Sequence, residues 1–325
     1  MALCGTVAGS WGRLPAVDPQ SVSDAFGFGR AYSLSEPLAR GELGEISRLE
    51  TQRGAWAVKQ SLEPGNNREL ETSAAYHRQC WDFGVPCPEP IRAVSGTFVT
   101  EVTGQFLRAY PWVDLNEPDA GIDPAAVGEL LATLHGVRRE PAGEVHEWFE
   151  APIGSQEWTR MLTASRTATA PYVDRLAELL PRIVEVESIL VPMTGVQTCH
   201  LDLWSDNVRR RPDGGLCVID FDNAGPADPS REVAMVLFEF GQGDEARRRK
   251  LYDAYRAAGG PGRVTGRDSF AMAVAQLHHI GHRHLRMWLD ASDDNARERS
   301  LAGVEEFLDE PLLLPEVDRV VAGLA

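Results

Sequence analysis

The chain has 325 residues, enough for one large domain or for two lobes that each bury a core. Hydrophobic residues make up 43% and charged residues 25%, values that are typical of a soluble globular protein. The net charge of −16 argues against nucleic acid binding, because phosphate groups are bound by clustered Lys and Arg. The longest apolar runs fall far short of the roughly 20 residues that a membrane helix needs.

The first residues, MALCGTVAGSWGRLP, contain no basic segment followed by an apolar core, so we expect no signal peptide. The five cysteines are scattered and show neither a disulfide framework nor a paired metal-ligand spacing. The sequence therefore predicts a reduced, cytoplasmic protein.

In chain order, residues 1–30 are rich in Gly, Ser and Pro, and we expect an arm with at most one short helix. From residue 31, short strand-like segments are separated by the turns ARGE and QRG and are followed by one helix that ends at GVPCPEP. The predicted strands are AYSLSEPL, LGEISRLET, GAWAVKQSL, PIRAVSGT and QFLRAYPWV, and the helix is NNRELETSAAYHRQCWDFG.

After Asp114 the spacing of apolar residues becomes helical, first in Pro124–Val137 and then around WTRML and YVDRLAELLPRIVEVESIL. A β-rich first part and an α-rich second part predict an α+β protein of two lobes. We expect the lobes to comprise residues 31–113 and 114–325, with a connector near residues 109–114.

Residues 199–228, CHLDLWSDNVRRRPDGGLCVIDFDNAGPAD, have the pattern of a polar loop, a hairpin with a Pro-Asp-Gly-Gly turn, and a second polar loop. The hairpin holds the two loops side by side, so Asp202, Asn207 and Asp220 are expected to converge. Two carboxylates and a carboxamide oxygen are hard ligands of the kind that Mg²⁺ prefers.

Any one of these residues alone is more commonly a loop residue that forms an Asx turn. A thiol nucleophile at Cys199 beside His200 is disfavoured, because neighbours in an extended segment point to opposite faces. His278 and His282 lie one helical turn apart, as in some zinc sites, but the segment lacks the glutamate of a zinc-protease helix and a third ligand. We interpret it as a core or site-lining helix.

Phosphoryl transfer from ATP requires a base for the attacking hydroxyl, metal ligands, and a lysine that neutralises phosphate charge. The chain has only two lysines, Lys59 and Lys250, so a lysine in the AVK context of a strand indicates that arginine would not serve there. Lys59 is therefore the predicted phosphate-binding residue.

A carboxylate on the helix after that strand is expected to orient Lys59, and Glu69 and Glu71 are the candidates. We favour Glu71, because two alanines three and four residues later allow its face of the helix to pack on the sheet. Gly41 and Gly44 lie in the first turn, and we leave open whether they form a plain hairpin or approach the phosphates.

HLDLWSDN followed by VIDFDNAGPADP resembles the catalytic and metal-binding loops of the aminoglycoside phosphotransferase and choline kinase-like branch of the protein-kinase-like fold. LLATLHG (Leu130–Gly136) and GVPCPEP are also similar to segments of this family. The resemblance covers about residues 31–300 and is weakest in the glycine turn.

The resemblance implies a bilobal kinase-like fold and an enzyme that uses ATP, or GTP, together with Mg²⁺. It assigns Asp202 as the catalytic base, Asn207 and Asp220 as Mg²⁺ ligands, Lys59 as a phosphate ligand, His200 as a brace, and the backbone near Ala109, Tyr110 and Trp112 as the adenine-binding hinge. This chain departs from many relatives at Trp204, Asp206 and Glu232.

The family's acceptors are hydroxylated small molecules, and cationic ones need carboxylates near the catalytic loop. Candidate acceptor residues are Asp206, Glu157, Asp290, Trp204 and Trp288, with Trp158, Asp293 and Asp294 as further members of the set. Our leading hypothesis is an antibiotic-inactivating O-phosphotransferase, and the alternatives are a metabolite kinase and a non-catalytic nucleotide-binding regulator. The sequence leaves the acceptor, ATP or GTP preference and oligomeric state open.

Overall fold

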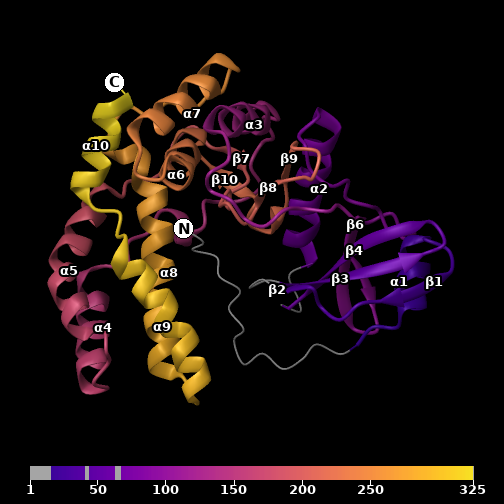
Figure 1. The fold of residues 1–325 in the computed structure, drawn as a ribbon, viewed down its shortest axis with the longest axis horizontal. Helices are drawn as coiled ribbons and strands as arrows, with labels where there is room; N and C mark the ends of the chain where they lie inside the picture. The colour runs from indigo at the N-terminus through magenta and orange to yellow at the C-terminus, as the bar shows by residue number, and fades with distance from the viewer. Residues whose placement is uncertain (1–15, 41–43, 63–66, 325) are drawn as a thin grey trace.

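The computed structural model describes residues 16–40, 44–62 and 67–324. An antiparallel sheet with one long helix forms the N-terminal lobe, and a larger group of helices forms the C-terminal lobe (Figure 1). The two-lobed α+β organisation expected from the sequence is confirmed.

The N-terminal sheet has the strand order β1-β3-β4-β6-β5, and β2 pairs with β3. Antiparallel pairing follows from the short turns between successive strands, such as the one that joins Thr51 to Gly54. The strands are β1 (Ala31–Leu34), β2 (Ala39–Arg40), β3 (Gly44–Thr51), β4 (Gly54–Ser61), β5 (Thr100–Val102) and β6 (Gln105–Pro111).

The strand predicted in residues 90–97 is wrong. Ile91 makes only an isolated bridge to Ala109, and the chain then turns at Gly96, whose N–H donates to the carbonyl of Ala93. The proline at position 90 lacks a backbone donor, and the Ser-Gly pair that follows favours a turn. The sheet is completed instead by β5, beside β6.

The one short helix allowed for residues 1–30 is α1 (Pro19–Phe26), and it packs in the core of the N-terminal lobe and not as a loose arm. Asp18 caps α1, and Val22 and Phe26 are buried in the same apolar core as the strands. Phe28 stacks on Trp56 of β4 with ring centroids 3.7 Å apart. Residues 1–15 lie outside the described part of the chain.

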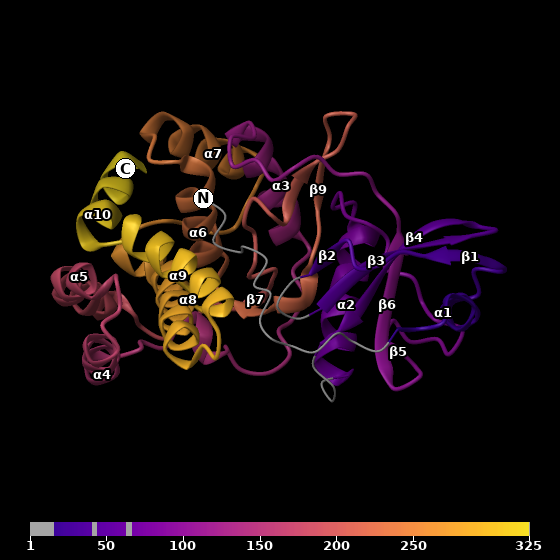
Figure 2. The same ribbon diagram turned by 60° about the horizontal axis from the view of Figure 1, so that its bottom comes forward.

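Helix α2 (Asn67–Phe83) packs between the sheet and the C-terminal lobe (Figure 2). His77 of α2 stacks on Phe221 of the C-terminal lobe, with ring centroids 4.0 Å apart. The N–H of Val218 donates to the carbonyl of Pro86 at 2.8 Å. These contacts hold the second polar loop and β9 against α2 and the turn that follows it.

The C-terminal lobe contains the second and larger core, which the buried helix α6 crosses. Its helices are α3 (Pro124–Gly136), α4 (Ser155–Thr167), α5 (Val173–Val186), α6 (Pro229–Gly241), α7 (Glu245–Ala257), α8 (Ala271–Asp290), α9 (Asp294–Asp309) and α10 (Leu314–Leu324). Two small antiparallel pairs complete it: β7 (Gln197–Cys199) with β10 (Gly225–Ala227), and β8 (Val208–Arg210) with β9 (Leu216–Val218).

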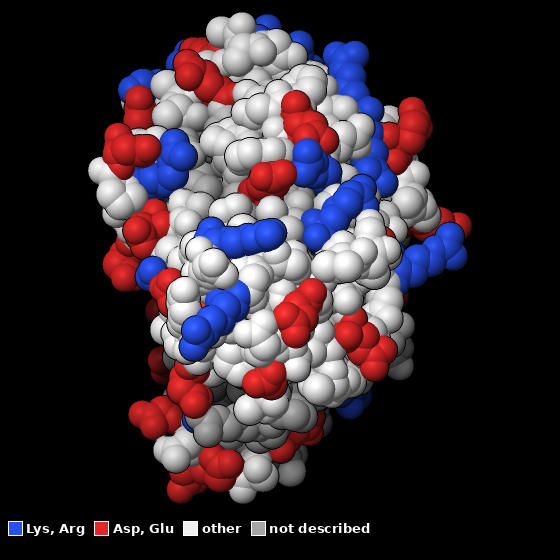
Figure 3. All heavy atoms as spheres, turned by 90° about the vertical axis from the view of Figure 1, so that its right-hand side faces the viewer, with Lys and Arg blue, Asp and Glu red and all other residues white. Residues whose placement is uncertain are grey.

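Acidic and basic side chains alternate on the outer face of the molecule that Figure 3 shows. Mixed charge of this kind differs from the clustered basic surface that nucleic acid binding requires. None of the described helices is long and apolar enough to cross a membrane.

Candidate active site

The first polar loop joins β7 to β8 and places Asp202 next to Asn207. The side-chain amide of Asn207 donates to the Asp202 carboxylate at 2.9 Å and to the Asp202 backbone carbonyl at 2.9 Å. Both hydrogens of the amide are thereby used, so the carboxamide oxygen of Asn207 is the atom able to bind a cation.

Leu201 lies in the left-handed backbone region, with φ of 67°, directly before Asp202. This conformation is unfavourable by roughly 1–2 kcal/mol for a residue with a Cβ, so other groups must hold it. Glu232 of α6 accepts the Leu201 N–H at 2.5 Å, and Gln276 of α8 donates to the Leu201 carbonyl at 2.9 Å. Glu232 therefore braces the loop from a helix of the core.

His200 is buried and links the two polar loops. Its Nε2 donates to the carbonyl of Ile219 at 3.1 Å, and its Nδ1 accepts the N–H of Asp202 at 3.3 Å. These contacts require the neutral tautomer protonated at Nε2, and burial lowers the pKa of His200 in agreement. His200 positions the loop, as the sequence resemblance implied.

Lys59 connects the sheet to the second polar loop. Its Nζ lies 2.6 Å from Oδ1 of Asp220 and 2.8 Å from Oδ2 of Asp222. Arg108 of β6, the cross-strand neighbour of Lys59, binds Asp222 through two hydrogen bonds, one of them 2.8 Å long. Asp220 itself has a left-handed backbone, with φ of 59°.

This network keeps its charges in a buried setting. Burial disfavours the charged form of Lys59, but Asp220 and Asp222 outweigh it and raise the pKa of that ammonium. Burial likewise opposes ionisation of Asp222, yet Arg108 and Lys59 hold the pKa of its carboxyl well below the usual range. Lys59, Arg108 and Asp222 are therefore ionised at neutral pH.

Sequence reasoning gave no role to Arg108 or Asp222. The available signal was a charged residue inside the otherwise apolar strand QFLRAYPWV and a second aspartate in IDFD.

Asp202 carries the pKa of a general base rather than that of an exposed acid. Burial and, after it, the negative charge of Asp220 raise the pKa of Asp202 to about 7, while hydrogen bonds from Asn223 and Asn207 act in the opposite direction. A carboxyl with this pKa exchanges its proton near neutral pH.

The predicted pairing of Glu71 with Lys59 is contradicted. The Glu71 carboxylate instead accepts the backbone N–H groups of Phe98 and Val99 at 2.9–3.1 Å. Lys59 takes its charge partners from the second polar loop. The helical pattern correctly placed Glu71 on the face of α2 that packs on the lobe. Its carboxylate, however, binds the two N–H groups that follow the turn at Gly96.

The predicted hinge, Ala109 to Trp112, lies at the end of β6 and at the start of the segment that follows it. Trp112 donates its backbone N–H to the carbonyl of Ala55 at 3.0 Å, and the Ala109 carbonyl accepts from Ile91 at 2.9 Å. These two backbone groups are therefore already paired within the lobe. The ring of Tyr110 stacks on the imidazole of His77 in α2, with ring centroids 5.3 Å apart.

Of the two turn glycines, Gly41 lies outside the described residues. Gly44 begins β3, where a Cβ would lie 2.7 Å from the carbonyl oxygen of Gln60. The absence of a side chain at Gly44 is thus explained by close strand pairing beside Lys59.

The predicted acceptor residues are largely excluded by burial. Trp204 and Trp288 are 2% and 6% exposed, and Trp158 is fully buried with its indole N–H on Glu187. Trp288 packs edge-on against Tyr172 at 5.3 Å. Trp158 and Trp288 lie on the inward-facing apolar sides of α4 and α8, and Trp204 is buried from the first polar loop, so all three rings belong to the core.

Glu157 and Asp290 also lie away from the catalytic loop. Glu157 binds Arg160 and His282, at 2.6 and 2.7 Å. Asp290 follows Gln276 by 14 residues on α8, about 21 Å at 1.5 Å per residue, whereas Gln276 contacts the loop. Asp206, four residues after Asp202, remains close to the base and has one buried oxygen without a hydrogen-bond partner.

Two other groups of potential ligands are structural. His278 and His282 bind different carboxylates, Glu187 and Glu157, and both imidazoles pack edge-on against Trp158.

His135, Cys199 and Glu232 lie within 4.8 Å of one another, but His135 bonds to Glu232 at 2.7 Å and to Tyr255 at 2.8 Å. Both ring nitrogens of His135 are thereby occupied.

A small antiparallel sheet with one helix, a helical lobe, and a lysine and aspartates at their junction define the class of protein-kinase-like folds. Among solved structures, an aminoglycoside phosphotransferase from Alicyclobacillus acidocaldarius matches 97% of both chains with a TM-score of 0.63 at 15% identity. Spectinomycin phosphotransferase in complex with ADP and spectinomycin matches 94% of this chain and 97% of its own, with a TM-score of 0.64 at 13% identity. At these identities the similarity establishes the fold.

The chain belongs to the phosphotransferase enzyme family, whose model matches residues 36–273. Homoserine kinase from Methylobacillus glycogenes is 26% identical over 221 residues, which are 65% of this chain and 64% of that kinase. The matched stretch thus spans just under two thirds of that relative. A choline kinase from Streptococcus pneumoniae shares the fold, with a TM-score of 0.53 at 14% identity over 88% of this chain and 97% of its own.

Proposed function

We propose that the protein is an ATP- and Mg²⁺-dependent O-phosphotransferase that acts on a hydroxyl group of a small molecule. The observation that carries the proposal is the convergence of Asp202 and Asn207 from one loop with Lys59 and Asp220 across the lobe boundary. Family membership and the kinase-like fold support it.

Asp202 acts as the base. Its carboxylate accepts the proton of the acceptor hydroxyl as the hydroxyl oxygen bonds to the γ-phosphorus and the bond from that phosphorus to the β–γ bridging oxygen breaks. ADP and a phosphate monoester are the products. The pKa of about 7 allows Asp202 to take this proton at neutral pH and to release it afterwards.

The residues present fit a divalent cation. Asp220 and the carboxamide oxygen of Asn207 are hard oxygen donors on adjacent loops, as Mg²⁺ prefers. The cation supplies charge neutralisation on the transferred phosphate when it is bound. Lys59, released in part from Asp220, would then bind phosphate oxygens, and Arg108 would keep Asp222 paired.

We place the adenine edge one residue further along the hinge than the sequence suggested. Neighbouring residues of a strand direct their backbone groups to opposite edges, and Trp112 faces β4. The carbonyl of Pro111 and the N–H of Val113 therefore face the open edge of β6, where a purine can hydrogen-bond. This revises the contacts proposed for Ala109 and Trp112.

For the acceptor, we favour a hydroxylated antibiotic of cationic character, so that the reaction would inactivate it. Solved structures of the fold include a spectinomycin phosphotransferase, which supports this choice. The alternative is a metabolite kinase with an amino-alcohol acceptor, favoured by the similarity to a homoserine kinase. We also propose a cytoplasmic location, where ATP is available and the buried cysteines at positions 80, 87, 199 and 217 remain reduced.

The test is an ADP-release assay with Mg-ATP against a panel of antibiotics and amino alcohols, with mass spectrometry of each product. We expect acceptor-dependent ADP release and a mass increase of one phosphate on one member. Asp202→Ala protein is the control for contaminating kinases. ADP release that is independent of every acceptor and equal in the variant would contradict the proposal.

A further inference from the structure

Lys59 and Arg108 form a pair of like charges inside the N-terminal sheet. They are direct partners across β4 and β6, so their side chains lie on the same face of the sheet. Both side chains are buried. Like charges directly opposite each other are destabilising, so the pair needs an anion between its members, and Asp222 supplies it.

Asp222 is fixed in place by two sets of contacts. Arg108 donates to both of its carboxylate oxygens, a bidentate contact that also sets the plane of the carboxylate. The preceding residue, Phe221, lies in the same short 3-10 helix and stacks on His77 of α2. Oδ2 of Asp222 therefore meets the Lys59 ammonium at 2.8 Å from a carboxylate that has little freedom to move.

The two aspartates that contact Lys59 differ in exposure. The Asp220 side chain is 31% exposed, and the Asp222 side chain is 3% exposed. Asp220 is thus the carboxylate that a metal ion can reach, and Asp222 is the one that stays on the lysine. The carboxylate of Glu71, expected from the sequence to hold Lys59, is bound to backbone N–H groups instead.

These contacts leave an excess of positive charge once Asp220 binds a metal ion. Two cations, Lys59 and Arg108, face two carboxylates in the structure, so the charges balance. With Asp220 committed to the metal ion, Asp222 alone remains for both cations, and one positive charge is left over. A phosphate group is the kind of ligand that such a charge attracts.

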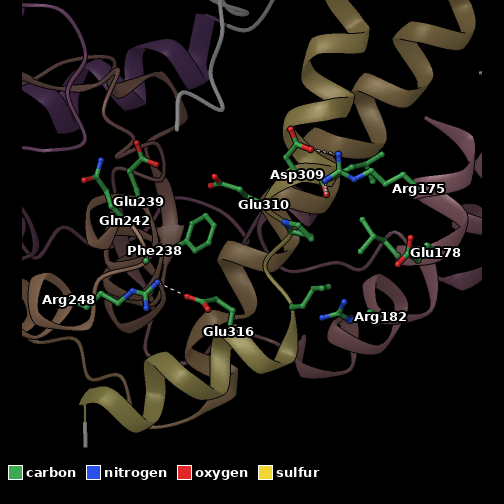
Figure 4. Close-up of a pocket in the computed structure, with 15 residues that line it drawn as sticks. Arg175, Glu178, Arg182, Phe238, Glu239, Gln242, Arg248, Asp309, Glu310 and Glu316 are labelled. Carbon is green, nitrogen blue, oxygen red and sulfur yellow. Dashed lines mark hydrogen bonds and ion pairs between the residues drawn. The ribbon is translucent and has the colours of Figure 1, made fainter. Parts of the chain in front are cut away.

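A second carboxylate shared by two cations shows why burial matters. Glu316 of α10 binds Arg248 at 2.6 Å and also binds Arg319, beside a cavity of about 810 Å³ between α5, the end of α6 and the segment that joins α9 to α10 (Figure 4). Arg319 is 65% exposed, so water screens the extra charge there. Lys59 and Arg108 are both shielded from water, so their extra charge is left to act on a ligand.

We infer that Arg108 and Asp222 are positioning residues for Lys59. Asp222, held by the fork of Arg108, keeps the Lys59 ammonium directed at the phosphate groups of the nucleotide, in the role expected for Glu71 from the sequence. The inference rests on the proposed function, because it takes the nucleotide phosphates to lie at Lys59. Neither Arg108 nor Asp222 contacts the nucleotide, so both act through the lysine.

The test is a cycle of variants that shows whether the effect of this pair passes through Lys59. Asp222→Asn alone leaves two buried cations to one carboxylate and is expected to destabilise the fold. The pair variant Arg108→Met/Asp222→Asn removes one charge of each sign and keeps the net charge. Calorimetry measures the Kd of Mg-AMP-PNP, a non-hydrolysable nucleotide, for the wild type, the pair variant, Lys59→Met and the triple variant.

We expect the pair variant and Lys59→Met each to weaken binding of Mg-AMP-PNP about 10- to 100-fold, the range for a hydrogen bond to a charged group. The triple variant should bind within about threefold of Lys59→Met, because the pair has nothing to position once the ammonium is gone. Glu71→Gln, the control on α2, should leave the Kd unchanged, since its remaining oxygen still accepts a backbone N–H.

A pair variant that binds Mg-AMP-PNP as tightly as the wild type would overturn the inference. A triple variant that binds more than about threefold less tightly than Lys59→Met would also overturn it, since additive losses mean that the pair acts without the lysine. A crystal structure of the wild type with Mg-AMP-PNP is the second measurement and does not depend on the folding of any variant. Lys59 should remain within hydrogen-bond distance of Asp222, and a Lys59 bound to Glu71 would refute the inference.

Failure of the proposed function gives a different result. If no acceptor in the ADP-release panel is phosphorylated but the losses in the cycle are non-additive, the positioning of Lys59 stands and the kinase activity does not. If an acceptor is phosphorylated and the pair variant turns it over at the wild-type rate, the function stands and this inference fails.

Discussion

Lys59 Nζ lies 2.6 Å from Oδ1 of Asp220, although the two residues are 161 positions apart in the chain. The ion pair joins the central strand of the N-terminal sheet to the loop that follows β9, and it is shielded from water on the lysine side. The nucleotide site that we propose is thus defined by a contact between lobes.

Replacement of Lys59 tests whether a compact ammonium is required there. Lys59→Arg should lower turnover by tenfold or more, because a planar guanidinium does not fit between Asp220, Asp222 and the phosphates. Steady-state kinetics with varied ATP measures this. Lys250→Arg is the matched control, since that lysine is exposed and pairs with Asp123. A fully active Lys59→Arg enzyme would refute the role of Lys59.

Removal of the base should affect chemistry and not nucleotide binding. Asp202→Ala should reduce turnover about 10²- to 10⁴-fold, the usual contribution of a positioned general base. Calorimetry should give a Kd for Mg-ADP within about threefold of that of the wild type, because in our proposal Asp202 does not contact the nucleotide or the metal ion. Retained turnover in the variant would exclude Asp202 as the base.

The raised pKa of Asp202 predicts proton release when a magnesium nucleotide binds. Burial and the charge of Asp220 raise this pKa to about 7, and a cation at Asp220 offsets that repulsion. The pKa then falls below about 7, so the carboxyl, about half protonated at pH 7, loses its proton. Calorimetry in two buffers of different ionisation heat should detect up to about half a proton released. Asp202→Asn should release none, and an equal release from the variant would show that another group titrates.

Glu71 should contribute to stability and not to catalysis. Glu71→Ala leaves two backbone N–H groups, those of Phe98 and Val99, without their carboxylate and should lower the free energy of unfolding by about 1–3 kcal/mol. Urea unfolding measures this change, while turnover per folded molecule should be unchanged. If a Glu71→Gln protein were stable but inactive, the result would instead support the original hypothesis that Glu71 pairs with Lys59 during turnover.

His77 should make the protein sensitive to acid. Burial lowers the pKa of this imidazole from 6.5 to about 3, and its Nε2 has no hydrogen-bond partner. The unfolded chain therefore takes up a proton first, so this contribution to stability is intact above pH 6.5 and decreases as the pH falls to about 3. The expected slope is about 1.4 kcal/mol per pH unit.

His77→Phe, which can keep the stack on Phe221, should remove that slope from the pH dependence of unfolding. The difference between wild type and variant isolates His77 from the other titrating groups. A difference that does not vary between pH 6.5 and 4 would contradict a buried neutral imidazole.

The local pattern of apolar and turn residues was sufficient to predict most helices and strands, including β3, β4, α2 and the hairpin of β8 and β9. It failed at residues 90–97, where a β-rich composition was overridden by Pro90 and by the turn at Gly96. It allowed a short helix before residue 31 but did not place α1 in the core, because the burial of its apolar residues depends on the sheet beside them.

By itself the sequence determined the parts of the site whose spacing is local: the loop with Asp202 and Asn207, the following Asp220, and a lysine kept in an arginine-rich chain. Tertiary structure decided the rest. It paired Lys59 with Asp220 and Asp222 instead of Glu71 and placed Arg108 on the same Asp222. It also buried the tryptophans expected at the acceptor and left Oε2 of Glu239 without a donor. The physical reason is that burial and charge pairing depend on residues far apart in the chain, and a one-dimensional pattern does not specify which of them meet.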